Sequence, residues 1–323
     1  MSSTGAQLSQ QSTQRYSAFD LLRHRWSANF LQFCSSWDTF RRNPLGIVGL
    51  TIILIFAISS FIHPMLIGTV WPERIYDPMK GFDIELIPHP TAPSSEHLLG
   101  TDNFGRDILS QLVFAARSSF LVGLGAAVVA VSISTLVGGM AGYFGGMSNA
   151  ILMGVADVFV LAPAPIILLI FGLIVTLEVW HIILLYGILV GLGGQAIVVK
   201  SHTLTIATKT YIDVARLSGG GHFHILRQHI LPALMPLALV QAVFTVVGAV
   251  LTESLLSFYA RSNDVITWGS MIFLNQRTFR WFTLDGQWHA IIWPALAIML
   301  FCSSFYLVGR ALDEIVNPKL RKR

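Results

Sequence analysis

The side chains that could do chemistry in this sequence are few, and their spacing matches none of the common enzyme sites. The chain has no Gly-Lys pair and therefore no GxxxxGK[ST] phosphate loop, and it also lacks HExxH, CxxC and GxSxG motifs. His222, His224 and His229 lie close together, but they do not supply a helical i, i+4 pair with a third ligand, as a metal site would require. We therefore expect a non-catalytic chain that binds no metal and no cofactor of its own.

Composition places the chain in a lipid bilayer. Of its 323 residues, 54% are hydrophobic and 12% are charged, about half the roughly 25% that is typical of soluble domains. Long intervals contain no Asp, Glu, Lys or Arg, and a membrane-spanning helix needs about 20 apolar residues. These intervals predict an all-α, polytopic membrane protein with six transmembrane helices, near residues 45–63, 118–140, 149–174, 180–199, 233–257 and 289–309. The second helix carries Gly138-xxx-Gly142, a spacing typical of closely packed helices.

The distribution of Lys and Arg predicts the orientation, because short loops rich in these residues stay on the cytoplasmic side. The residues before the first span contain five, the segment from Lys200 to Arg227 four, and the residues from Arg310 onward five, against three in each of the other two long loops. Both termini are therefore expected in the cytoplasm, in a protein of the cell (inner) membrane, and the basic tails are interpreted as topology signals rather than nucleic-acid sites. The expected parts are a cytoplasmic tail with an amphipathic segment (1–43), a first transmembrane helix (44–64), an external loop with an amphipathic elbow helix (65–116), a five-helix domain (117–310) with a cytoplasmic loop at 205–232, and a basic cytoplasmic tail (311–323).

Two carboxylates inside the predicted spans are candidates for a translocation path. Asp157 lies in the third span, close to Pro163 and Pro165, which remove backbone donors and are expected to bend or break that helix. Glu253 lies near the external end of the fifth span. Intramembrane carboxylates are functional candidates by default, but a helix–helix hydrogen bond for Asp157 and simple solvation for Glu253 remain alternatives.

The segment that leads into the second span contains a compact group of polar residues. Thr101 or Asp102 is expected to cap the amphipathic elbow helix, because a side-chain oxygen can accept from the first free backbone N–H groups. The adjacent Arg106 and Asp107 are interpreted as a salt-bridged elbow rather than as catalytic groups.

The longest polar interruption on the predicted cytoplasmic side runs from Tyr211 to Pro232. Residues up to Ser218 suit a short helix, Gly219-Gly220-Gly221 must turn, and a second short helix is expected to end where Pro232 opens the fifth span. The buried side of the two halves is expected to comprise Ile212, Ala215, Leu217, Ile225, Leu226 and Ile230. Such an element could fit a groove on another protein and pass its motion to the fifth span, although an ordinary intracellular loop remains an alternative.

The same stretch carries a motif with fixed spacing. Asp213-Val214-Ala215 is followed after three residues by Gly219 and after ten more by Ile230-Leu231-Pro232. This pattern resembles the EAA loop of ABC importer permeases, with Asp213 in place of the usual Glu and Val214 in place of the first Ala. Further stretches are similar to the C-type permease subunit of the dipeptide, oligopeptide and nickel importer family (binding-protein-dependent transport system inner membrane components). They begin at Arg42, His97, Gly142, Leu251, Trp268 and Asn317.

The resemblance implies a type I ABC importer permease fold, in which this chain forms half of a translocation path beside a homologous B-type permease. It also implies two cytoplasmic P-loop ATPases, which bind ATP and Mg, and an extracytoplasmic solute-binding protein. The residues that it implies in ATPase coupling are Asp213, Val214, Ala215, Gly219, Gly220, Ile230, Leu231 and Pro232. Di- or oligopeptides are the expected cargo, with glutathione, nickel chelates and antimicrobial peptides left open. An ion-coupled secondary transporter and a non-transport membrane scaffold are the alternatives.

Overall fold

The computed structural model describes residues 37–85, 89–259, 266–278 and 288–316. The chain divides into two units, Met1–Pro44 and Leu45–Arg323. Within the first, residues 37–41 are helical, and Arg41 and Arg42 both form ion pairs with Asp38.

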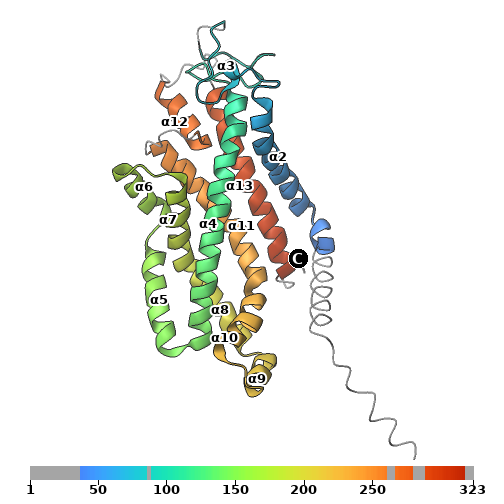
Figure 1. The fold of residues 1–323 in the computed structure, drawn as a ribbon, viewed down its shortest axis with the longest axis vertical. Coiled ribbons are helices and arrows are strands. Elements are labelled where there is room, and N and C mark those ends of the chain that lie inside the picture. The colour runs from blue at the N-terminus through green and yellow to red at the C-terminus, as the bar shows by residue number, and fades with distance from the viewer. Residues whose placement is uncertain (1–36, 86–88, 260–265, 279–287, 317–323) are drawn as a thin grey trace, which may run out of the picture. The chain divides into compact units, whose positions relative to one another are not determined.

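The second unit is built from helices, and its described residues contain no β-strand. Its α-helices are α2 (Pro44–Leu66), α3 (Glu73–Tyr76), α4 (Ile108–Phe144), α5 (Gly146–Leu161), α6 (Ala164–Ile174), α7 (Val179–Leu192), α8 (Gly194–Ala207), α9 (Thr210–Leu217), α10 (His222–Ile225), α11 (Leu231–Tyr259), α12 (Trp268–Thr278) and α13 (His289–Val316). A π-helical segment, η1 (Leu226–Ile230), joins α10 to α11. Figure 1 shows α4 running along the bundle, and it packs against α7, α8 and α11.

Within the described part of the chain, four helices are long and apolar enough to cross a membrane, and two bent helix pairs bring the number to six if each pair crosses once. This agrees with the six predicted spans. The α5–α6 pair is bent by 70°. The bend follows from the two prolines, because Pro163 is the N-cap of α6 and Pro165 lies in its first turn, where a missing N–H costs no helical hydrogen bond.

Close contact between α4 and α8 depends on two glycines, as the Gly138-xxx-Gly142 spacing predicts. A Cβ added to Gly142 would lie 2.7 Å from the Cβ of Thr203 and 2.9 Å from the carbonyl oxygen of Lys200. A Cβ on Gly138 would collide with the carbonyl oxygen of Ala196. The C-terminal half of α4 therefore lies directly on the backbone of α8.

An aromatic cluster holds the opposite half of the bundle together. Trp268 is fully buried and forms edge-to-face contacts with Phe56 of α2 and Phe301 of α13. Its indole N–H donates to the carbonyl oxygen of Leu112 in α4 at 3.1 Å. The short helix α12 is thus fixed to three membrane helices, since the indole satisfies its polar group while burying its rings.

Candidate functional site

The predicted turn after residue 218 is a helix-ending Schellman motif. At the end of α9, the backbone N–H of Gly220 donates to the carbonyl oxygen of Ala215, and that of Gly219 donates to Arg216, both at 3.0 Å. Gly219 has φ +84°, the left-handed conformation that this motif requires and that glycine adopts without strain.

The two glycines are required for different reasons. Around Gly219 there is open space, so a side chain there would strain the backbone without a collision. Gly220 has an ordinary φ, but a Cβ on it would lie 2.7 Å from the carbonyl oxygen of Ala215. The prediction that residues 219–221 turn is confirmed, and the geometry gives Gly219 and Gly220 separate roles in it.

The expected stop at Pro232 is wrong. A single helical path runs from His222 to Tyr259, through α10, η1 and α11. The N–H of Leu231 donates to the carbonyl oxygen of Leu226, five residues back, and Pro232 follows immediately. A proline removes one donor and crowds the carbonyl four residues before it, and the wider π turn accommodates both effects without breaking the helix.

We call residues 210–230 the α9–α10 element. Its buried side is formed by Ile212, Ile225 and Ile230, which pack with Tyr143 of α4, Val199 of α8 and Leu234 of α11. Ala215 and Leu226 are partly buried against the same cluster, as predicted. Leu217 was expected on this side, but 88% of its surface is exposed. The element is therefore held on three membrane helices by a small apolar core.

The outer side of the α9–α10 element exposes apolar side chains. Leu217 and Phe223 are 88% and 73% exposed, and Tyr211 and Val214 are about half exposed. Asp213 forms an exposed ion pair with Arg216 at 3.3 Å, on the same helix. Exposed apolar side chains around a short helix suit contact with another protein better than contact with water.

The candidates for a translocation path lie in different surroundings. Asp157 is exposed on α5, about two turns before Pro163 and Pro165. Glu253 on α11 is only 1% exposed, so simple solvation of this carboxylate is ruled out. Among the described residues, neither of its oxygens has a partner with normal hydrogen-bond geometry, and the Thr267 side chain is placed to interact with it. A role for these residues in transport stays a prediction.

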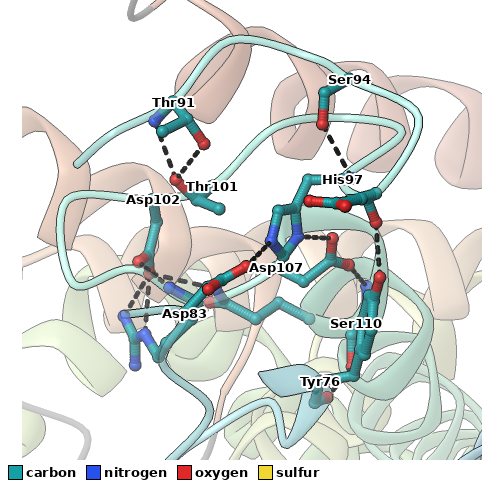
Figure 2. Close-up of polar contacts among 12 residues, drawn as sticks. Tyr76, Asp83, Thr91, Ser94, His97, Thr101, Asp102, Asp107 and Ser110 are labelled. Carbon is teal, nitrogen blue, oxygen red and sulfur yellow. Dashed lines mark hydrogen bonds and ion pairs between the residues drawn. The ribbon is translucent and has the colours of Figure 1, made fainter. Parts of the chain in front are cut away.

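At the other end of the bundle, the polar residues expected at the elbow belong to a larger buried cluster around His97, which was not predicted. Figure 2 shows His97 between two carboxylates: its Nδ1 lies 2.8 Å from Asp107 Oδ2 and its Nε2 lies 3.3 Å from Asp83 Oδ2. The hydrogen bond with Asp107 raises the pKa of His97, although burial opposes it. Burial alone would raise the pKa of Asp83, but hydrogen bonds from the Glu85 backbone and from His97 lower it.

Asp102 and Asp107 have exchanged the roles that were expected of them. Arg106 is paired with Asp102 at 2.6 Å, not with its neighbour Asp107. Asp107 is the N-cap of α4 and accepts from the backbone N–H of Ser110 at 2.7 Å. The elbow helix and the second span are therefore one helix, α4, that begins at the cap. The Asp107-x-x-Ser110 spacing was the available signal.

We call this cluster the polar cap, and its members share hydrogen bonds or ion pairs within the segment 76–111. They are Tyr76, Asp83, His89, Thr91, His97, Thr101, Asp102, Arg106, Asp107, Ser110 and Gln111. The cap also reaches two other helices. Thr101 O accepts from His289 Nε2 of α13 at 3.2 Å, and Asn103 contacts Asn275 of α12 through two hydrogen bonds.

Comparison with known families agrees with this architecture. Residues 134–322, more than half of the chain, match the family described as binding-protein-dependent transport system inner membrane component. The chain belongs to this family. Residues 32–81 match the N-terminal transmembrane domain of oligopeptide transport permease C. The predicted family and the multi-pass inner membrane character are thereby confirmed.

Individual relatives cover most of the chain. It is 29% identical to a dipeptide transport system permease protein of Bacillus subtilis over 289 residues, 89% of this chain and 86% of the relative. It is 29% identical to a glutathione transport system permease protein of Pectobacterium atrosepticum, over 88% of this chain and 90% of the relative. An oligopeptide transport system permease protein of Bacillus subtilis is 28% identical, with 88% of each chain covered.

Proposed function

We propose that this permease is one of two membrane subunits of an ATP-driven importer of peptides, and that its α9–α10 element is the docking site for a partner ATPase. The proposal is carried by one observation. Helix α9 exposes apolar side chains, and a Schellman turn joins it to the helical path that continues across the membrane as α11. The names of the relatives supply the cargo class, because they are permeases for dipeptides, oligopeptides and glutathione.

The geometry suits the transmission of a mechanical stroke. An ATPase that closes on ATP and moves α9 would also displace α10, because Ile212 and Ile225 pack in one apolar core. Displacement of α10 passes to α11 without a flexible joint, since the helical path from His222 to Tyr259 is unbroken. Movement of α11 would also move the buried Glu253, which lies on this helix. Helix α11 packs against α12.

The subunits of the proposed importer would have different tasks. ATP and Mg would be bound by the two P-loop ATPase partners, and this chain would supply only the docking surface and half of the path. A homologous permease would complete the path. Both termini and the α9–α10 element would face the cytoplasm, and the polar cap would face the solute-binding protein on the other side.

The test is uptake of labelled peptides into lipid vesicles that contain the permease pair and the ATPases, with the solute-binding protein on the side of the polar cap. Uptake is expected with ATP, and it is expected to persist when an ionophore abolishes ion gradients. Uptake that follows the ion gradient and ignores ATP would indicate an ion-coupled secondary transporter. Vesicles that take up no peptide, although all subunits are assembled, would support the scaffold alternative.

The cargo can be resolved in the same vesicles. Dipeptides, longer peptides and glutathione are offered singly, each together with the solute-binding protein. We expect uptake of a peptide of at least one of these classes. Transport of a nickel chelate with no transport of any peptide would contradict the proposed cargo class while leaving the ATP-driven mechanism intact.

A further inference from the structure

Tyr143, near the end of α4, touches both halves of the α9–α10 element. Only 9% of its surface is exposed. Its hydroxyl lies 3.0 Å from His222 Nδ1 on α10, and the guanidinium carbon of Arg216 on α9 lies 5.6 Å from the centre of its ring. The ring also packs in the apolar core with Ile212 and Ile225. One side chain of α4 thus contacts the element on each side of the Gly219 turn.

The same end of α4 is joined to the helix that precedes the element. Gly142 lies against the backbone of Lys200 and the side chain of Thr203 in α8. Only two residues, Thr208 and Lys209, separate α8 from α9. The end of α4, the end of α8 and the α9–α10 element are therefore packed as one body.

The other end of α4 is fixed in the polar cap. Asp107 caps the helix, and the buried His97 holds this carboxylate and Asp83 together. Between Asp107 and Tyr143 the helix is continuous over 37 residues, Ile108–Phe144, a length of about 55 Å at 1.5 Å per residue. Figure 1 shows α4 spanning the bundle from the region of α3 to that of α10.

These contacts form a direct mechanical route that does not pass through α11. We propose that Tyr143 is a positioning residue that transfers displacement of the α9–α10 element to α4, and that α4 carries it to the polar cap as a change in the affinity of the cap for the solute-binding protein. This inference rests on the proposed function, because it requires the ATPases on one side and the solute-binding protein on the other. It assigns to α4 a signalling role beside the transport stroke carried by α11.

If Tyr143 transfers displacement to α4, substitutions at Tyr143 should weaken the coupling between the α9–α10 element and the polar cap. Tyr143→Leu removes the hydroxyl contact with His222 and the ring beneath Arg216 while keeping an apolar side chain in the core. Tyr143→Phe removes the hydroxyl alone. Tyr306→Phe on α13 is the matched control, since no hydrogen bond of the Tyr306 hydroxyl is found among the described residues and half of this side chain is exposed.

The measurement is the affinity of the complete assembly, in lipid nanodiscs, for the solute-binding protein, with and without a non-hydrolysable ATP analogue. In the wild type and in Tyr306→Phe, the two affinities are expected to differ by about five-fold or more, the lower end of typical coupling between sites. In Tyr143→Leu, the ratio of the affinities with and without nucleotide should fall toward one while the affinity without nucleotide is unchanged. Tyr143→Phe should give an intermediate ratio.

A loss of packing alone would not produce this pattern, because it would change the affinity without nucleotide as well. A wild-type ratio in correctly assembled Tyr143→Leu complexes would overturn the route, as would a wild type whose affinity ignores the nucleotide. Peptide uptake by the same preparation separates the two proposals. If the wild type takes up peptide with ATP and the ratio is unaffected by Tyr143→Leu, the route fails and the importer function stands; if ATP drives no uptake, the importer function fails first.

Discussion

The two ends of the helical bundle are built on opposite principles. The polar cap buries its charges: His97 is fully enclosed between Asp83 and Asp107, and Asp102 accepts from Arg106 and Gln111 in the same layer. The α9–α10 element does the reverse. Its charged pair is exposed to solvent and its outer face is apolar.

This difference between the two ends predicts which substitutions lower the stability of the protein and which impair its function. A buried charge left without its partner costs about 3–5 kcal/mol, whereas an exposed ion pair contributes about 0–1 kcal/mol. Changes in the polar cap are therefore expected to lower the stability of the fold. Changes on the outer face of the α9–α10 element are expected to leave the fold intact and to act through a partner.

The largest effect is expected from Asp107→Ala. This change removes the N-cap of α4 and leaves the buried His97 without its closer carboxylate. We expect the free energy of unfolding to fall by about 3–5 kcal/mol, as for a broken buried pair. Thermal or denaturant unfolding of the purified protein in detergent measures it, with Asp313→Ala in α13 as a control outside the cap. A loss below about 1 kcal/mol, the range of an exposed pair, would contradict the contrast between the ends.

The second effect concerns transport more than stability. Gly219→Val places a β-branched residue at φ +84°, which costs about 1–2 kcal/mol in the left-handed region. The Schellman turn is expected to change shape, so that ATP-dependent peptide uptake is lost while membrane insertion persists. Gly221→Ala is the neighbouring control, because this residue has φ −67° and open space around it. Normal uptake by the valine variant would show that the turn does not transmit the stroke.

The third effect is a dependence of the cap on pH. The pKa of His97 is raised above its usual 6.5, mainly by the hydrogen bond with Asp107. Its stabilising contribution is therefore complete below pH 6.5 and is lost as the pH rises through the raised value. Asp83 has a lowered pKa, so its contribution is present above 3.8, its usual value, and disappears as the pH falls through the lowered one.

The pH dependence is measured as the difference in thermal stability between the wild type and His97→Gln in detergent, between about pH 6 and about pH 9, so that groups common to both proteins cancel. The wild type should lose stability toward the alkaline end. His97→Gln should be less stable at the acid end and nearly flat across the range. Parallel curves for the two proteins would show that the imidazole carries no charge in the cap.

The smallest effect on stability is expected from Asp213→Ala. Its ion pair with Arg216 is exposed, so the free energy of unfolding should change by about 0.5 kcal/mol or less. Because Asp213 stands where the importer family has Glu, Asp213→Glu should retain peptide uptake. A large destabilisation by the alanine variant would indicate that this end of the bundle is held together by charge after all.

The number and order of the membrane helices could be predicted because the bilayer imposes a rule on sequence: about 20 residues without charge for each crossing. The helix ends could not be predicted in the same way. Helix α4 begins at Ile108, ten residues before its charge-free interval, and α8 extends to Ala207, because caps and packing set a helix end, not the absence of charge. The continuous helix through Pro232 depended on a π turn, which leaves no mark in sequence periodicity.

The candidate site was predictable where local geometry determined it. Gly219 was identified from the turn it must make, and Ile212, Ile225 and Ile230 from helical periodicity. His97 was missed because its partners lie 10 and 14 residues away across an irregular segment, so nothing local indicates the pairing. Leu217 was misplaced because an apolar residue on an exposed helix face has the same sequence pattern as one in a core.

The central claim is that the α9–α10 element contacts an ATPase, and a photo-cross-linking amino acid at Leu217 tests it directly. This side chain is 88% exposed and has no role in the apolar core. In membranes that contain the complete assembly, we expect ultraviolet light to join this chain to the ATPase subunit, in a yield that changes when ATP is added. Cross-links to lipid or to the partner permease, with none to the ATPase, would contradict the account.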